Sequence, residues 1–434
     1  MLGMRPKAQG FEQLKDQAGT MVSGMVPPLA DREALQRQSG LLVVVSAAHL
    51  VSHFYILVLP VLIPLFKNAL GVGFFEIGLA LTTFNVVSGL TQAPMGFVVD
   101  RAGPRLVLVA GLCLGGLAFA ILGLWTTYPV LIAVAILAGL ANCVYHPADY
   151  ALLAEAIPEH RIGRAFSLHT FAGFAGGALA PPILLGVAAY SGLNTALLFA
   201  GLVGPAVGAV LLLGGRITGT SHRARASESG SGRHGLASVL SPAIIGLTGF
   251  FTLLALSSGA IQSFAVVALL ATQDVTLASA NIALTAYLSC AALGVLAGGF
   301  LADRTTSHGY VAAIGFSLTT AIVAGIATLA LPAALIIGAF AFAGFLSGII
   351  MPSRDMLVRK AAPPGMVGRA FGIVSTGFNI GGIIGPLLFG WIMDNASPRW
   401  VFGACAVFMA VTALFGIASE GRARRRLAAE VSAR

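Results

Sequence analysis

The sequence predicts an all-α integral membrane protein with twelve transmembrane helices, arranged in two six-helix halves. Only 9% of its residues are charged and 57% are hydrophobic, whereas a soluble domain carries about a quarter charged residues. Apolar runs of about 20 residues, the length that a bilayer requires, follow one another from Leu41 onward. A long segment of the first part of the chain also recurs in the second, which indicates two halves of one design.

The repeat is defined by matched prolines and by a basic motif. Pro147 corresponds to Pro352, and at the same offset the sequence GRAF occurs at 163–166 and at 368–371. Each copy consists of an apolar run, a short basic loop and a glycine-rich apolar run. We therefore expect a pair of membrane helices in each half, joined on the side that holds the positive charge.

The apolar runs divide the chain in order. We expect membrane spans near residues 41–66, 75–99, 106–125, 130–153, 164–190, 195–214, 242–270, 277–302, 310–330, 333–357, 370–392 and 400–419. The corresponding regions are a polar tail at 1–40, a first half at 41–214, a linker at 215–240, a second half at 241–419 and a basic tail at 420–434. The linker is rich in Ser, Gly and Arg, a composition typical of a flexible connection.

The basic residues predict the orientation of the chain. With the amino terminus inside, all of the 25 Lys and Arg residues except Lys67 and Arg399 lie in the inner loops and tails. This asymmetry predicts cytoplasmic termini and a place in a bacterial-type inner membrane. The net charge of +9 does not indicate a nucleic-acid partner, because the basic residues are spread among loops and form no continuous patch.

A second repeated motif follows the second and the eighth spans. The sequence GFVVDR at 96–101, with Gly103 and Arg105 after it, has a shorter counterpart, GFLADR, at 299–304. It resembles the G-x-x-x-D-R-x-G-R loop of the major facilitator superfamily, whose fold the resemblance implies. It further implies that Asp100 latches the two halves together in the outward-open state, since a carboxylate is attracted to the positive end of a neighbouring helix. The latch residues are then Gly96, Asp100, Arg101, Arg105, Asp303 and Arg304.

The first span resembles that of fosmidomycin-resistance-type exporters. It carries His49, His53 and Tyr55 before a Leu-Pro…Pro run, and Tyr145-His146-Pro147 in the fourth span is also similar to that group. The resemblance implies export. Those relatives have an Asp where this chain has His53, so either the proton site has moved or the coupling differs.

Four ionisable residues are candidates for proton coupling: His49, His53, His146 and Asp149. His49 and His53 are four residues apart and share one helix face, and a histidine titrates near neutral pH. The alternative is that each His only donates a hydrogen bond to a neighbouring helix. Because such a pair supplies only two ligands, the sequence predicts no metal site, and no other cofactor is expected.

Other polar residues in the spans predict the cavity and its inner gate. Candidates for lining the cavity are Tyr55, Asn85, Gln92, Asn142, Gln262, Tyr287 and Asn379. Candidates for an inner gate are Arg164, Arg354, Asp355 and Arg369. No membrane Lys is available, so we expect a small organic solute that is neutral, weakly anionic or amphipathic.

The sequence therefore predicts a monomeric secondary transporter, driven by protons, that exports its substrate by alternating access. It contains no G-x-x-x-x-G-K-[ST] loop for ATP, and no nucleophile–base set that would make it an enzyme. An uptake symporter of the same fold is the main alternative, and a non-transporting membrane sensor is another.

Overall fold

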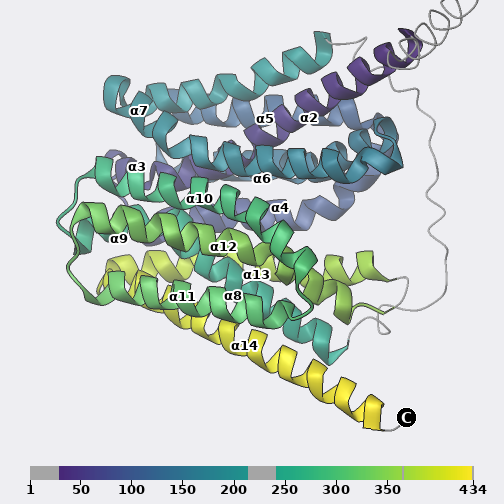
Figure 1. The fold of residues 1–434 in the computed structure, drawn as a ribbon. Coiled ribbons are helices and arrows are strands. Elements are labelled where there is room, and N and C mark those ends of the chain that lie inside the picture. The colour runs from purple at the N-terminus through teal and green to yellow at the C-terminus, as the bar shows by residue number, and fades with distance from the viewer. Residues whose placement is uncertain (1–28, 214–240, 364–365, 433–434) are drawn as a thin grey trace, which may run out of the picture.

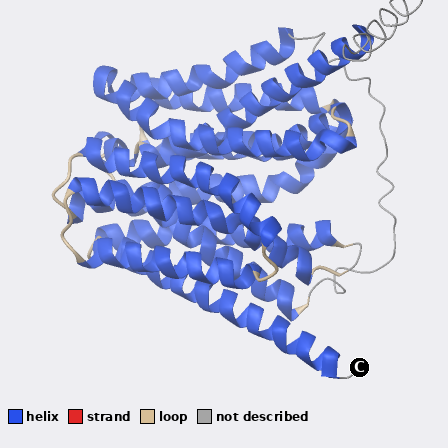
Figure 2. Ribbon diagram, viewed as in Figure 1, coloured by secondary structure: helices blue, strands red, loops and turns tan. Residues whose placement is uncertain are grey.

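The structure is a computed structural model, and it describes residues 29–213, 241–363 and 366–432 (Figure 1). These residues form helices joined by short loops, without strands (Figure 2). The predicted linker and most of the predicted amino-terminal tail lie outside the described residues. Figure 1 shows the helices as two bundles, with the first half of the chain in one and the second half in the other.

The first half contains six labelled helices. They are α2 (Leu29–Val61), α3 (Ile63–Leu70), α4 (Phe74–Ala102), α5 (Pro104–Leu124), α6 (Tyr128–Ala156) and α7 (Glu159–Leu213). Helix α2 begins before the predicted first span and extends into the part of the chain predicted as a tail. Helix α7 is broken at Gly192, whose φ of 84° lies in the left-handed region that glycine adopts readily. It therefore contains both the fifth and the sixth predicted spans.

The second half repeats this arrangement. It comprises α8 (Pro242–Gly259), η2 (Ala260–Phe264), α9 (Ala265–Thr272), α10 (Leu277–Arg304), α11 (His308–Thr328), α12 (Ala333–Ala361), α13 (Val367–Asn395) and α14 (Arg399–Ser432). Helices α8 and α9 with the π-helical turn η2 between them form the seventh span. Eleven described segments are long and apolar enough to cross a membrane, and the break in α7 brings the number to the predicted twelve.

Glycines let α10 and α12 approach closely. A Cβ atom at Gly344 or Gly348 of α12 would collide with the carbonyl oxygen of Tyr287 or Ala291 of α10. Gly294 of α10 faces the backbone of α12 in the same way. Small residues spaced four apart let membrane helices bring their backbones together, which gives several of the chain's 54 glycines a role in helix packing.

The two halves meet along α4 and α13, at the end where α4 begins and α13 ends. Backbone N–H groups of Phe74 and Phe75 donate to the carboxylate of Asp394, at 3.0 and 2.7 Å. Further along, the Thr82 hydroxyl donates to the Ile383 carbonyl at 2.9 Å. The predicted orientation makes this the outer end of the molecule.

The other end of α4 carries the predicted latch, which is not engaged. Asp100 and Arg101 are exposed, and a Cβ atom at Gly96 would have no neighbour within 4 Å. Gly96 therefore makes no close contact with a neighbouring helix in this conformation. The state described is closed at the predicted outer end and has a free Asp100 at the predicted inner end.

Arg105, one of the predicted latch residues, contacts a helix of its own half. Its guanidinium donates to the carbonyl oxygens of Leu211 and Leu212, at 2.6 to 3.1 Å. These carbonyls belong to the last turn of α7, whose C=O groups have no partner within the helix. Arg105 thus caps a neighbouring helix as well as adding positive charge to the loop. In the second half, Asp303 and Arg304 are exposed at the end of α10.

Candidate functional site

Three helices of the first half bring five ionisable side chains together. Helix α2 contributes His49 and His53, α6 contributes His146 and Asp149, and α7 contributes His169. The spacings of four residues on α2 and three on α6 place each pair on one helix face. We call these five residues the histidine–aspartate cluster.

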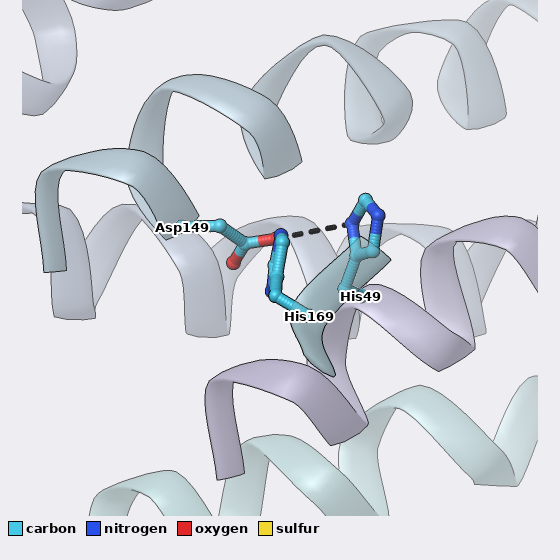
Figure 3. Close-up of side chains that lie close together, drawn as sticks. All are labelled: His49, Asp149 and His169. Atoms are coloured by element: carbon cyan, nitrogen blue, oxygen red, sulfur yellow. Dashed lines mark ion pairs between the residues drawn. The ribbon is translucent and has the colours of Figure 1, made fainter. Parts of the chain in front are cut away.

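Asp149 lies beside the stacked imidazoles of His49 and His169 (Figure 3). Its Oδ2 atom is 3.4 Å from Nδ1 of His49 and 3.6 Å from Nε2 of His169. At these distances either His, if protonated, forms an ion pair with the carboxylate. The cluster can thus hold one proton in more than one place.

The imidazole rings pack against one another. The ring centroid of His49 is 3.9 Å from that of His169, 4.7 Å from that of His53 and 5.3 Å from that of His146. Opposite them on α7, a Cβ atom at Gly173 would come within 2.7 Å of the His49 ring. The absence of a side chain at Gly173 leaves the room that these rings occupy.

The centre of the cluster is sealed from solvent. Asp149 is 0% exposed and His169 is 1% exposed, whereas His53 and His146 are half-buried. Neither oxygen of Asp149 and neither nitrogen of His169 has a hydrogen-bond partner among protein groups. A buried carboxylate without a partner is costly, so Asp149 must take up a proton or lie beside a positively charged imidazole.

The cluster also brings together more possible metal ligands than the sequence suggested. His49, Asp149 and His169 each offer an atom within 4.8 Å of the others. The rings of His49 and His169 are stacked, however, with only 23° between their planes. Their in-plane lone pairs cannot converge on one ion unless a ring turns, so the arrangement does not itself favour a metal.

His169 was not among the residues that the sequence singled out. It lies within the repeated segment, between the GRAF motif and Gly173. The signal was present, because an ionisable residue inside a membrane span usually faces the bundle interior. What the sequence could not show is that α7 places His169 against α2 and α6.

Two predicted cavity residues lie where the halves meet, and two more are half-buried on neighbouring elements. Asn85 of α4 faces Gly382 of α13, and Asn379 of α13 faces Gly89 of α4. Gln92 is half-buried on α4. Gln262, also half-buried, belongs to η2, which packs against α2 of the other half. A π-helical turn of this kind is frequent at functional sites.

Three other predicted cavity residues are instead used for packing within a half. The Tyr55 hydroxyl accepts a hydrogen bond from the backbone N–H of Gly204 at 2.8 Å. The Asn142 amide donates to Ser88 at 2.8 Å, and the buried Tyr287 hydroxyl donates to Ser347 at 3.2 Å. Their polar atoms thus hold helices together, and a substrate would have to displace these bonds to reach them.

The predicted gate residues are only partly brought together. Arg354 donates to Oδ1 of Asp355 at 2.9 Å, and its guanidinium lies over the rings of Phe251 and Phe378. Arg164 is exposed on α7, and the side chain of Arg369 lies outside the described residues. Of the predicted gate residues, the structure pairs Arg354 with Asp355. Arg164 is not part of this pair.

Comparison with known proteins gives the family. The model of the Major Facilitator Superfamily matches residues 45–267 and 248–432. Over 389 residues the chain is 25% identical to the fosmidomycin resistance protein of Escherichia coli (strain K12), covering 85% of this chain and 89% of that protein. It is also 30% identical to a probable L-galactonate transporter of the same organism, over 27% of this chain and 26% of the relative.

Solved structures share the fold at low sequence identity. A bacterial homologue of the human lysosomal transporter Spinster, in an inward-facing and occupied conformation, superposes with a TM-score of 0.71 at 15% identity. It is matched over 96% of its length and 88% of this chain. The nucleoside transporter NupG gives a TM-score of 0.70 at 16% identity, over 99% of its length and again 88% of this chain. With twelve spans, two repeated halves and a family match over most of its length, the chain is a secondary transporter of the major facilitator superfamily and not an enzyme.

Proposed function

We propose that this transporter exports a small organic solute in exchange for protons, across a bacterial inner membrane with both termini in the cytoplasm. The observation that carries the coupling is the histidine–aspartate cluster. It places a fully buried carboxyl group, Asp149, among imidazoles inside a membrane-spanning half. Ionisable residues at such depth are typical of proton relays in transporters.

The cluster has a gradient of accessibility that suits a relay. His53 and His146 are half-buried, while His49, His169 and Asp149 are sealed. A proton that enters through a half-buried imidazole can pass to Asp149 by way of His49 or His169, since each lies within 3.6 Å of the carboxylate. The rocking of the halves would then change the side to which the entrance opens.

The direction of transport is supported by a relative that matches most of the chain. The fosmidomycin resistance protein covers 85% of this chain, and resistance to a toxic compound is what an exporter confers. The state described also suits loading from the cytoplasm, because its halves are joined at the predicted outer end. The substrate is expected to sit between the halves, near Asn85, Asn379 and Gln262.

The direct test uses purified protein in proteoliposomes with an imposed pH gradient. The first probes are fosmidomycin, L-galactonate and a nucleoside, which are compounds that the names of similar transporters supply. Exchange for protons predicts that a probe accumulates on the more acidic side. Accumulation on the more alkaline side would identify a symporter instead.

His53→Gln is expected to reduce gradient-driven flux while exchange of substrate at equal pH on both sides survives. Glutamine has a similar size and hydrogen-bonding capacity, but it does not titrate near neutral pH. His53→Asp restores the residue of the similar exporters and should retain coupling with a shifted pH optimum. Flux measured against pH for the wild type and both variants decides the matter. Full gradient-driven transport by His53→Gln would place the relay elsewhere in the cluster.

Asp100→Asn is expected to shift the protein toward the inward-facing state. The superfamily loop implies that the Asp100 carboxylate meets the amino end of a helix of the other half when the inner end closes. The amide lacks the charge that is attracted to the helix end. Distances between spin labels on the two inner rims should lengthen on average. An unchanged distribution would leave Asp100 with no part in latching.

A further inference from the structure

The interface between the halves contains two aspartates, Asp394 and Asp100, at opposite ends of the helix pair α4 and α13. Asp394 lies in the last turn of α13, and Asp100 lies in the last turn of α4. Each carboxylate is therefore near the carboxyl end of its own helix, and α4 and α13 cross the interface in contact with one another. One aspartate is at the predicted outer end and the other at the predicted inner end.

The contact at the outer end is specific. Both oxygens of Asp394 are used, with Oδ1 accepting from the Phe74 N–H at 3.0 Å and Oδ2 from the Phe75 N–H at 2.7 Å. These N–H groups are in the first turn of α4, where helical N–H groups have no partner of their own. Gly73 precedes this turn and makes no side-chain cap, so the cap comes from the other half of the molecule.

The facing sides of α4 and α13 carry glycines that let the two backbones approach closely. On α13, Gly382, Pro386, Gly390 and Asp394 recur every four residues and so lie on one face. A Cβ atom at Gly390 would lie 2.6 Å from the Phe74 carbonyl oxygen. On α4, a Cβ atom at Gly78 would collide with the Pro386 carbonyl oxygen. The two backbones can touch only because Gly78 and Gly390 lack side chains. Asp394 lies at the end of this row of close contacts.

The charges around the contact favour an anion there. The positive end of the α4 dipole points at Asp394. Lys67, one of only two basic residues predicted on the outer side, lies with its Nζ atom 3.8 Å from the centre of the Phe74 ring. The carboxylate of Glu76 also lies close to Gly73, so a negative neighbour opposes the contact. A latch that must open and close benefits from such a balance, because neither state is then held too strongly.

We propose that Asp394 is a positioning residue of the transport cycle that holds the outer end closed by capping α4. In this scheme Asp394 and Asp100 act alternately on the same two helices. The carboxylate of α13 engages the start of α4 when the outer end is closed, and the carboxylate of α4 engages the start of α13 when the inner end is closed. The proposal goes beyond the proposed function, since it holds for any substrate, coupling ion or direction.

The test measures the width of the outer end in full-length protein reconstituted in nanodiscs. Nitroxide labels on Thr127→Cys and Ala330→Cys, in a background without the four native cysteines, report the distance between the loops α5–α6 and α11–α12. Asp394→Ala is expected to raise the ratio of outer-open to outer-closed molecules by about tenfold, the effect of losing a charged hydrogen-bond pair. Asp394→Asn, which keeps one acceptor oxygen, should give a smaller shift.

Asp274→Asn is the matched control, because Asp274 is an exposed acid of the same half at the same end. It should leave the distance distribution unchanged. Adding Asp100→Asn to Asp394→Ala should move the distribution back toward that of the wild type, which a merely structural role for Asp394 does not predict. An outer distance unchanged in a stable Asp394→Ala protein would overturn the proposal, as would an equal shift in Asp274→Asn.

Discussion

Asp149→Asn is expected to reduce gradient-driven flux to the level of vesicles without protein. Asparagine preserves the volume and polarity of the side chain but cannot release a proton. Asp149 is the most deeply buried carboxylate among the described residues, with 0% of its surface exposed, and it lies within 3.6 Å of both sealed imidazoles of the cluster. No other described acid is placed to take over its part in a relay.

The measurement compares two kinds of flux in the same proteoliposomes. Flux driven by a pH gradient should disappear, whereas exchange of labelled for unlabelled probe at equal pH should continue. The second assay shows that the variant is folded and binds its substrate. Glu155→Gln is a suitable control, because Glu155 lies at the exposed end of the same helix and should not affect either flux. If Asp149→Asn kept its gradient-driven flux, the carboxyl group would have no role in coupling.

Gly344→Leu is expected to prevent α10 and α12 from packing and so to abolish a stable fold. The obstacle is the backbone carbonyl of Tyr287, which cannot move aside as a side chain would. Overpacking a core by a few methylene groups typically costs about 1–3 kcal/mol, and a clash with backbone in a close helix pair should lie at or above that range. Size-exclusion chromatography and thermal unfolding in detergent provide the measurement.

The matched control for this substitution is Gly338→Leu on the same helix. Gly338 is exposed, and a Cβ atom there would meet nothing within 4 Å. Both variants add the same side chain and remove the same flexible residue from α12. Equal stability of the two would show that the close approach of α10 and α12 does not depend on a glycine at 344.

The architecture was predictable because a bilayer restricts the structures that can span it. A span must be helical and about 20 residues long, so apolar length alone indicated twelve spans, and the repeat divided them into halves. The short gap predicted between the fifth and sixth spans, at 191–194, contains Gly192, where α7 is broken. Helix α2 begins at Leu29, before the apolar run, because a helix need not end where the bilayer does.

The site was predictable only along single helices. Spacing on one helix predicted that His49 and His53 share a face, and their ring centroids lie 4.7 Å apart. Contacts between helices depend on packing that no spacing records, which is why His169 was missed. The same limit explains Tyr55, whose hydroxyl binds Gly204, 149 positions away in the sequence, and is thus engaged in packing.

The most direct test of proton-coupled export follows protons while the substrate moves. Proteoliposomes are loaded with a transported probe and an entrapped pH-sensitive dye, with no initial pH gradient and with the membrane potential clamped by potassium and valinomycin. Dilution into probe-free buffer lets the probe leave. Exchange for protons predicts that the interior becomes acidic as the probe exits, and that Asp149→Asn vesicles show no such change. An interior that becomes alkaline, or that keeps a constant pH while the probe leaves at the wild-type rate, would contradict the account.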